Sequence, residues 1–160
     1  MSHSMEFEKA LAFINSIGIE TSFADLRDSS CFLPGLHIEN GCILIDSSLL
    51  ENPGDILHEA AHIALVSSNE RNDLNAATIE KRKDAAAEEM AAIAWTFAAC
   101  IFLELDPSFV FHETGYKGDA SSIATNFKNG NYFGVPILQW FGLTGSNGFA
   151  YPKMIKWTRE

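Results

Sequence analysis

Two histidines and a glutamate in the first half of the chain have the residue types and the spacing of a metal site. They are His58, Glu59 and His62, which form the pattern His-Glu-x-x-His. On an α-helix, residues four apart lie one turn above each other on one face, so both imidazoles can bind one tetrahedral Zn²⁺. Glu59, one residue further along, is placed to hold a metal-bound water and to accept its proton. The pattern therefore predicts metal-assisted hydrolysis with Glu59 as the general base.

The structural alternative is a helix that carries two partly buried histidines and a solvated glutamate. The residues that flank the pattern are apolar: Ile56, Leu57, Ile63 and Leu65. A helix buried this deeply does not carry two imidazoles and a carboxylate without partners, because unpaired buried polar groups are costly. The apolar flanks therefore favour the metal site.

A third protein ligand has to come from another element, and two adjacent glutamates are the candidates. Glu88 and Glu89 lie in an alanine-rich, otherwise apolar stretch. At helical spacing, Glu89 shares a face with Ile93 and Phe97, which continue inward, whereas Glu88 shares a face with Trp95. We predict Glu89 as the third ligand and keep Glu88 as the alternative. Two histidines and one glutamate favour zinc over other divalent ions.

A helix and a hairpin are predicted before the motif. Apolar residues at helical spacing indicate a helix over residues 6–17. Two β-prone runs, residues 31–38 and 42–45, then flank Asn40 and Gly41, a dipeptide typical of a two-residue hairpin turn. We expect this hairpin to form the sheet that supports the motif.

Two long helices are predicted to carry the candidate ligands. Asn52 as N-cap and Pro53 as first helical residue predict a helix over about residues 53–66, which contains the motif. A second helix is predicted over about residues 77–105, and it ends before Pro107, which cannot continue it. Alanines at its centre allow a neighbouring helix to approach closely.

The last third of the chain has weaker signals. Residues 119–127 are predicted to be helical, and the short apolar run 135–141 fits a strand or a helix equally well. Residues 152–157 are predicted to form a final helical turn. Its inward side chains would be Met154, Ile155 and Trp157.

Composition excludes several classes of protein. Lys and Arg number 11 and Asp and Glu 21, a net charge of −10, so we expect no nucleic acid and no anionic membrane surface as partner. The longest apolar stretch, residues 91–103, is shorter than the roughly 20 residues of a bilayer span. The three cysteines have no metal-site spacing, and their odd number does not favour disulfides; residues 1–5 lack the features of a secretory signal. We expect a cytoplasmic protein with free, buried thiols.

The pattern as a whole resembles a known family. His58-Glu-Ala-Ala-His62, with a hairpin before it and Glu88-Glu89-Met-Ala-Ala some 26–27 residues after it, is similar to the small gluzincin metallopeptidases of the ImmA/IrrE group. The resemblance covers about residues 33–103. It implies His58 and His62 as zinc ligands, Glu59 as catalytic base, Glu89 or Glu88 as third ligand, and a peptide or protein as substrate.

Two residues downstream of the second long helix are candidates for stabilising the transition state. His112 and Tyr116 can fold back over the metal, where either side chain would donate a hydrogen bond to the developing oxyanion. The alternative for each residue is an ordinary side chain in a surface loop.

Together these features predict one α+β domain over residues 1–160, with a core over about 31–105 and a C-terminal extension over 106–160. We expect a small, mainly antiparallel sheet packed on the motif helix and on the long third-ligand helix, a zincin-like arrangement. The function that follows is zinc-dependent hydrolysis of peptide bonds, with the sheet edge pairing with an extended peptide. The alternatives are a non-catalytic binding or regulatory module stabilised by the metal, and a metal-free structural protein. No oligomeric state follows from the sequence.

Overall fold

The computed structural model describes residues 3–29, 31, 33–113, 116–145 and 150–160, with the side chain of Lys117 left out. Phe32, in the first predicted strand, lies outside the described residues. The described part is an α+β fold with a three-stranded sheet and six α-helices. The helices are α1 (Met5–Ser16), α2 (Asp55–Ala64), α3 (Ala76–Ile79), α4 (Ala85–Phe102), α5 (Ala120–Lys128) and α6 (Val135–Trp140).

The sheet is mixed, which corrects the expectation of a mainly antiparallel one. Its strands β1 (Thr21–Phe23), β2 (Leu36–Glu39) and β3 (Cys42–Ile45) lie in the order β1-β3-β2. β2 pairs with β3 in antiparallel fashion, whereas β1 pairs with β3 in parallel. The chain reverses once between β1 and β2 and again at the hairpin, so β3 runs in the same direction as β1.

The predicted hairpin is confirmed, with a shorter first strand. Asn40 and Gly41 both have positive φ, at 49° and 76°, as a two-residue turn of this kind requires. β2 begins only at Leu36, because the chain turns immediately before it. There the Leu36 N–H donates to the Leu33 carbonyl, and Gly35 adopts a φ of 78°.

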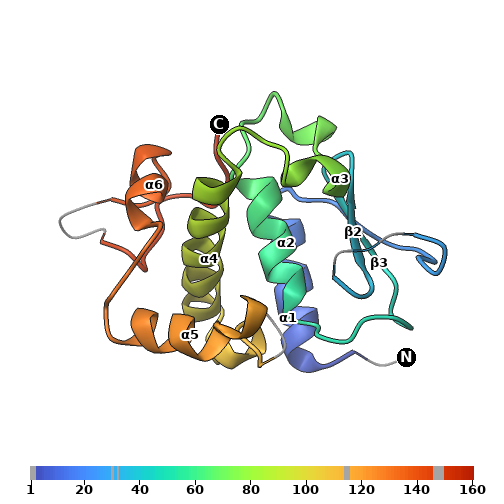
Figure 1. Ribbon diagram of the computed structural model, residues 1–160, viewed down its shortest axis with the longest axis horizontal. Coiled ribbons are helices and arrows are strands. Elements are labelled where there is room, and N and C mark those ends of the chain that lie inside the picture. The colour runs from blue at the N-terminus through green and yellow to red at the C-terminus, as the bar shows by residue number, and fades with distance from the viewer. Residues whose placement is uncertain (1–2, 30, 32, 114–115, 146–149) are drawn as a thin grey trace.

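Helix α2 lies at the centre of the molecule (Figure 1). In that view α1 lies behind it, α4 on one side and the sheet on the other, and α2 packs against all three. Eight of its ten residues are buried, and the two that are only partly buried are His58 and His62. The core therefore encloses this helix on every side except the one that the two histidines occupy.

The start of α2 differs from the predicted cap. The helix begins at Asp55 with Gly54 as N-cap, so Asn52 and Pro53 form the preceding turn instead. Gly54 packs against the backbone of Phe109, where an added Cβ would lie 1.7 Å from the Phe109 carbonyl oxygen. The start of α2 therefore lies against the backbone of a segment far from it in sequence.

The second predicted helix, residues 77–105, is broken in the structure. A short helix, α3, is followed by turns at residues 80–84, and α4 starts at Ala85. Arg82 folds back onto α4, where its Nε lies 2.9 Å from Oε2 of Glu88. In a continuous helix, residues six apart would lie on different faces, so this ion pair requires the break.

Helix α4 is a core helix rich in fully buried alanines. These are Ala91, Ala92, Ala94, Ala98 and Ala99, and α2 contributes Ala60, Ala61 and Ala64. No other pair of described helices shares as extensive a contact as α2 and α4. By length and composition, α4 also passes the test for a membrane span, which buried core helices pass as well, and 56% of its 18 residues are buried.

The C-terminal segment packs closely against the predicted core. The hydroxyl of Tyr151 donates to the Ala94 carbonyl (2.7 Å), and the indole of Trp95 donates to the Trp157 carbonyl (2.9 Å). The backbone N–H of Arg159 reaches the carbonyl of the last residue of α2 at 2.8 Å. Residues 150–160 therefore hold the C-terminal end of α2 and the middle of α4.

The final helical turn predicted over residues 152–157 is wrong, since no helix forms there. The backbone N–H of Ile155 donates instead to the Leu143 carbonyl at 2.8 Å. Ile155 is 57% exposed, while Trp157 packs edge-on against Trp95 at 5.4 Å between ring centroids. A backbone hydrogen bond to Leu143 thus takes the place of the i to i−4 hydrogen bonds that a helix would form here.

The three cysteines are free thiols, as predicted, but only one of them is fully buried. Burial raises the pKa of Cys100 to about 12. Cys31 and Cys42 are partly buried, and burial also raises the pKa of each thiol.

Enlarging a buried alanine on the face of α4 that carries Glu89 is expected to destabilise the fold. Ala92 is fully buried three residues after Glu89, whereas Ala86 on the same helix is exposed. We expect Ala92→Leu to lower the free energy of unfolding by about 1–3 kcal/mol, the usual cost of overpacking. Ala86→Leu should change it by less than about 0.5 kcal/mol. Urea unfolding of both variants measures the difference, and equal midpoints would contradict close packing at Ala92.

Candidate metal centre

His58 and His62 project from the same face of α2. They lie one turn apart, and their Nε2 atoms are 3.1 Å from each other. The two rings stand nearly perpendicular, at 86°, so both Nε2 atoms point to one place in front of the helix. The four-residue spacing in the sequence produces this convergence.

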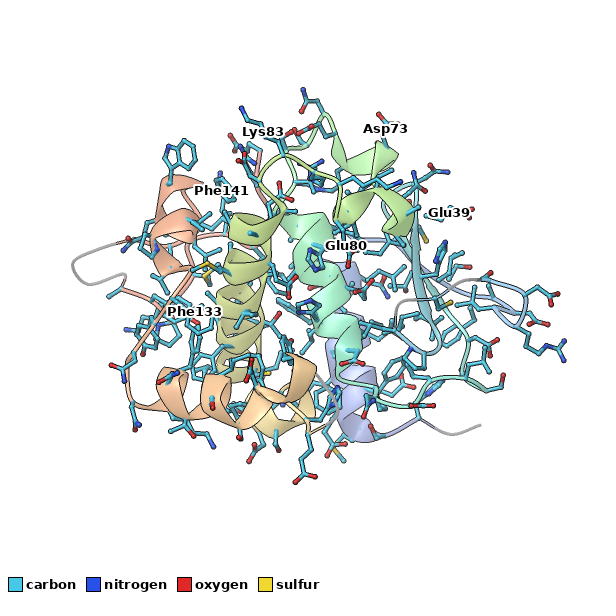
Figure 2. The ribbon with its side chains drawn as sticks, in the orientation of Figure 1. Glu39, Asp73, Glu80, Lys83, Phe133 and Phe141 are labelled. Atoms are coloured by element: carbon cyan, nitrogen blue, oxygen red, sulfur yellow. The ribbon has the colours of Figure 1, made fainter. Side chains whose placement is uncertain are left out.

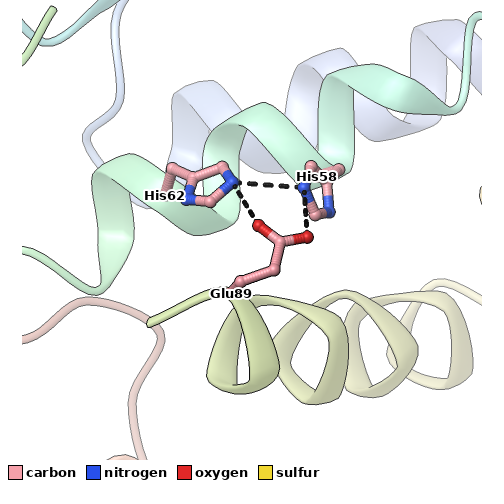
Figure 3. Close-up of side chains that lie close together, drawn as sticks. All are labelled: His58, His62 and Glu89. Atoms are coloured by element: carbon pink, nitrogen blue, oxygen red, sulfur yellow. Dashed lines mark hydrogen bonds and ion pairs between the residues drawn. The ribbon is translucent and has the colours of Figure 1, made fainter. Parts of the chain in front are cut away.

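Glu89 reaches the two histidines from α4 (Figure 3). Its Oε1 lies 3.3 Å from Nε2 of His58, and its Oε2 lies 3.1 Å from Nε2 of His62. Both imidazoles are largely buried, while the Glu89 carboxylate is partly exposed. The three side chains thus converge at a position that solvent can still reach.

The geometry of the three residues suits a divalent cation. Their potential ligand atoms all lie within 4.8 Å of one another. Ligands at about 2.0–2.1 Å from a tetrahedral zinc ion lie about 3.3–3.4 Å apart. The measured separations of 3.1–3.3 Å therefore need adjustments of only a few tenths of an ångström. Two imidazole nitrogens and one carboxylate are also a donor set that zinc accepts.

Glu89 and His58 stabilise each other's charged forms. Burial acts to raise the pKa of Glu89, but the hydrogen bonds from His58 and His62 outweigh burial and hold this pKa well below its usual range. For His58 burial acts to lower the pKa, and the contact with Glu89 reverses the direction and raises it. Glu89 is therefore ionised at neutral pH, as a metal ligand must be.

Glu88, the alternative third ligand, points elsewhere. Its two carboxylate oxygens lie 3.1 and 2.9 Å from Nε of Arg82. Arg82 also lies 3.9 Å from Glu70, which extends the ion pair across the turns between α3 and α4. The structure thus brings Glu89 to the histidines and uses Glu88 to hold the polypeptide at residues 80–84.

Glu59 is nearly buried next to the centre, at 9% exposure, and lines a cavity that lies in front of the three side chains. Burial raises its pKa, and the nearby His62 and His58 oppose this rise only in part. A carboxylate with a raised pKa is a better proton acceptor near neutral pH than an ordinary glutamate. This is the property that the predicted general base needs.

His112 bonds to a residue that sequence reasoning missed. Its Nε2 lies 2.7 Å from Oδ1 of Asp55, the buried first residue of α2. Burial raises the pKa of Asp55, and the contact with His112 counteracts this rise. Asp55 precedes His58 by three residues and His62 by seven, so helical periodicity alone places it on the same face. Asp55 lines the cavity, and His112 is not among the cavity-lining residues.

Tyr116 lies against the ring of His58. Its hydroxyl oxygen is 3.0 Å from Nδ1 of His58, and the two rings are perpendicular at 5.3 Å between centroids. His58 thus contacts Tyr116 through one ring nitrogen and Glu89 through the other. Burial raises the pKa of Tyr116 well above its usual value, so the phenol stays protonated.

A cavity of about 900 Å³ opens onto the His58, His62 and Glu89 side chains. In the view of Figure 2, two residues that line it, Glu80 and Phe133, lie to the right and left of α4. Most of its walls are apolar. They include Leu33, Ala76 and Ile79 on the side of the sheet and α3, and Ile93, Ile123 and Phe133 on the side of α4 and α5.

Comparison of this chain with protein-family models, curated proteins and solved structures finds no match. The observations that bear on function are the geometry of the His58, His62 and Glu89 cluster and the cavity in front of it.

Proposed function

We propose that this protein is a zinc-dependent metallopeptidase of the small gluzincin type, resembling the ImmA/IrrE group. The observation that supports this most strongly is the convergence of His58 and His62 from α2 with Glu89 from α4. Zinc bound there would polarise a substrate carbonyl and lower the pKa of water toward 7. His58, His62 and Glu89 would hold the ion, as the donor set and its spacing suggest.

Glu59 would move the proton in this reaction. It lies one residue after His58, is nearly buried, and has a raised pKa. These properties suit a carboxylate that accepts a proton from the attacking water and passes it to the leaving amine. The pair of Asp55 and His112 would hold the first turn of α2, and with it His58, in place.

The cavity would bind the substrate as an extended chain. Its apolar walls continue on both sides of the three side chains, which suits a peptide with apolar residues on either side of the cleaved bond. β2 lies at the edge of the sheet, and Leu33, just before it, lines the cavity. An extended peptide could therefore add to this edge through backbone hydrogen bonds.

Replacing Glu89 is expected to remove the metal, and replacing Glu88 is not. Wild type and Glu88→Ala should each bind one zinc ion per chain. Glu89→Ala should bind zinc more than about 100-fold more weakly, because the loss of an outer contact alone costs about 10–100-fold. Isothermal titration with zinc, alongside circular dichroism to verify folding, measures this. Stoichiometric, tight zinc binding by Glu89→Ala would contradict the assignment of the third ligand.

Glu59→Gln is expected to separate metal binding from turnover. The amide has nearly the shape of the carboxylate but accepts no proton, so zinc should stay bound while cleavage falls about 10²–10⁴-fold. Mass spectrometry of a peptide library incubated with each protein measures cleavage. Wild-type rates in the variant would refute the mechanism. Zinc binding without cleavage by the wild type would favour the non-catalytic binding module.

A further inference from the structure

We propose that Tyr116 is a positioning residue: its hydroxyl holds Nδ1 of His58 and so keeps the opposite ring nitrogen, Nε2, directed toward the metal position. The inference rests on the proposed zinc site. It adds Tyr116, which contacts the side of the His58 ring that faces away from the metal position. The positioning role adds to the transition-state donor role predicted for Tyr116 from the sequence.

The two nitrogens of the His58 ring face different groups. Nε2 faces the metal position, at 3.1 Å from Nε2 of His62 and 3.3 Å from Oε1 of Glu89. Nδ1, on the other side of the ring, lies 3.0 Å from the hydroxyl oxygen of Tyr116. A neutral imidazole carries one hydrogen, and the partner of one nitrogen decides whether the other has a free lone pair.

A tyrosine hydroxyl suits this position because it can both donate and accept. Without a cation, the hydroxyl can donate to Nδ1 of His58 while the Nε2–H faces Glu89. With a cation on Nε2, the ring hydrogen sits on Nδ1 and donates to the Tyr116 oxygen. The change moves one proton between the two ring nitrogens through solvent and leaves the net charge of the ring unchanged.

When the Tyr116 oxygen accepts from His58, its own hydrogen is free to turn. Tyr116 lines the cavity, so this hydrogen can point toward a bound substrate oxygen. The donor function predicted for Tyr116 would then be available only in the metal-bound protein. Tyr116 would thus make hydrogen-bond donation to the substrate depend on whether a metal ion is bound to His58.

The backbone shows that Tyr116 is held in place by its surroundings. Its φ is +56°, a left-handed conformation that costs a residue with a Cβ roughly 1–2 kcal/mol. The ring packs against Phe111 at 5.3 Å and against His58 at the same distance between centroids. A strained backbone of this kind persists only where the contacts of the residue compensate for it.

Tyr116→Phe tests the proposal, because it removes the hydroxyl and keeps the ring. We expect its zinc affinity to fall about 10–100-fold, the usual effect of losing an outer contact to a ligating histidine. Tyr151→Phe is the matched control. It also removes a buried hydroxyl, which bonds to the Ala94 carbonyl, and it should leave zinc affinity unchanged. Competition with a zinc-binding dye gives both affinities, and a Tyr116→Phe affinity within twofold of wild type would overturn the proposal.

A second measurement does not depend on zinc binding. Nitrogen-15 NMR of the metal-free proteins at alkaline pH, where the His58 imidazole is neutral, reports which nitrogen carries the hydrogen. In wild type and Tyr151→Phe the hydrogen should sit predominantly on Nε2, because the Tyr116 hydroxyl donates to Nδ1, whereas Tyr116→Phe should raise the Nδ1–H fraction. The same tautomer in all three proteins would overturn the positioning role. Failure of the wild type to bind zinc would instead overturn the proposed function.

Discussion

The close packing of α2 against α4 is the constraint on which the rest of the structure depends. A glutamate side chain is short, so Glu89 reaches the two histidines only if the helices approach closely. The buried alanines of both helices make that approach feasible, because they place little volume between the backbones. The site is therefore a consequence of how two helices pack and not of any loop that must fold over it.

Most other parts of the fold hold these two helices in position. Gly54 lets the start of α2 touch the backbone near Phe109, and residues 150–160 bind the carbonyls at the ends of α2 and in α4. Two carboxylates beside the site are paired: Asp55 with His112, and Glu88 with Arg82. The first pair matters most, because Asp55 is buried and removing one partner of a buried pair typically costs about 3–5 kcal/mol.

Local patterns in the sequence predicted the features that depend on a few adjacent residues. The spacing of His58 and His62 placed them on one face of a helix, and Asn40-Gly41 marked the hairpin. The break before α4 was missed because the helical pattern was followed through residues 80–84, where Arg82 turns back to pair with Glu88. The irregular C-terminal segment, the parallel pairing of β1 with β3 and the pairing of His112 with Asp55 were missed for another reason. Each of them depends on contacts between segments distant in sequence, which periodicity does not report.

Zinc K-edge X-ray absorption on the protein with one equivalent of zinc tests the central claim most directly. We predict that the zinc ion is surrounded by nitrogen and oxygen atoms at about 2.0–2.1 Å, and that the spectrum also contains scattering from the more distant ring atoms of two imidazoles. A sulfur neighbour at about 2.3 Å would show that a cysteine binds the ion instead, and a spectrum of hydrated zinc would show that no site exists. Either result would contradict a metal centre formed by His58, His62 and Glu89.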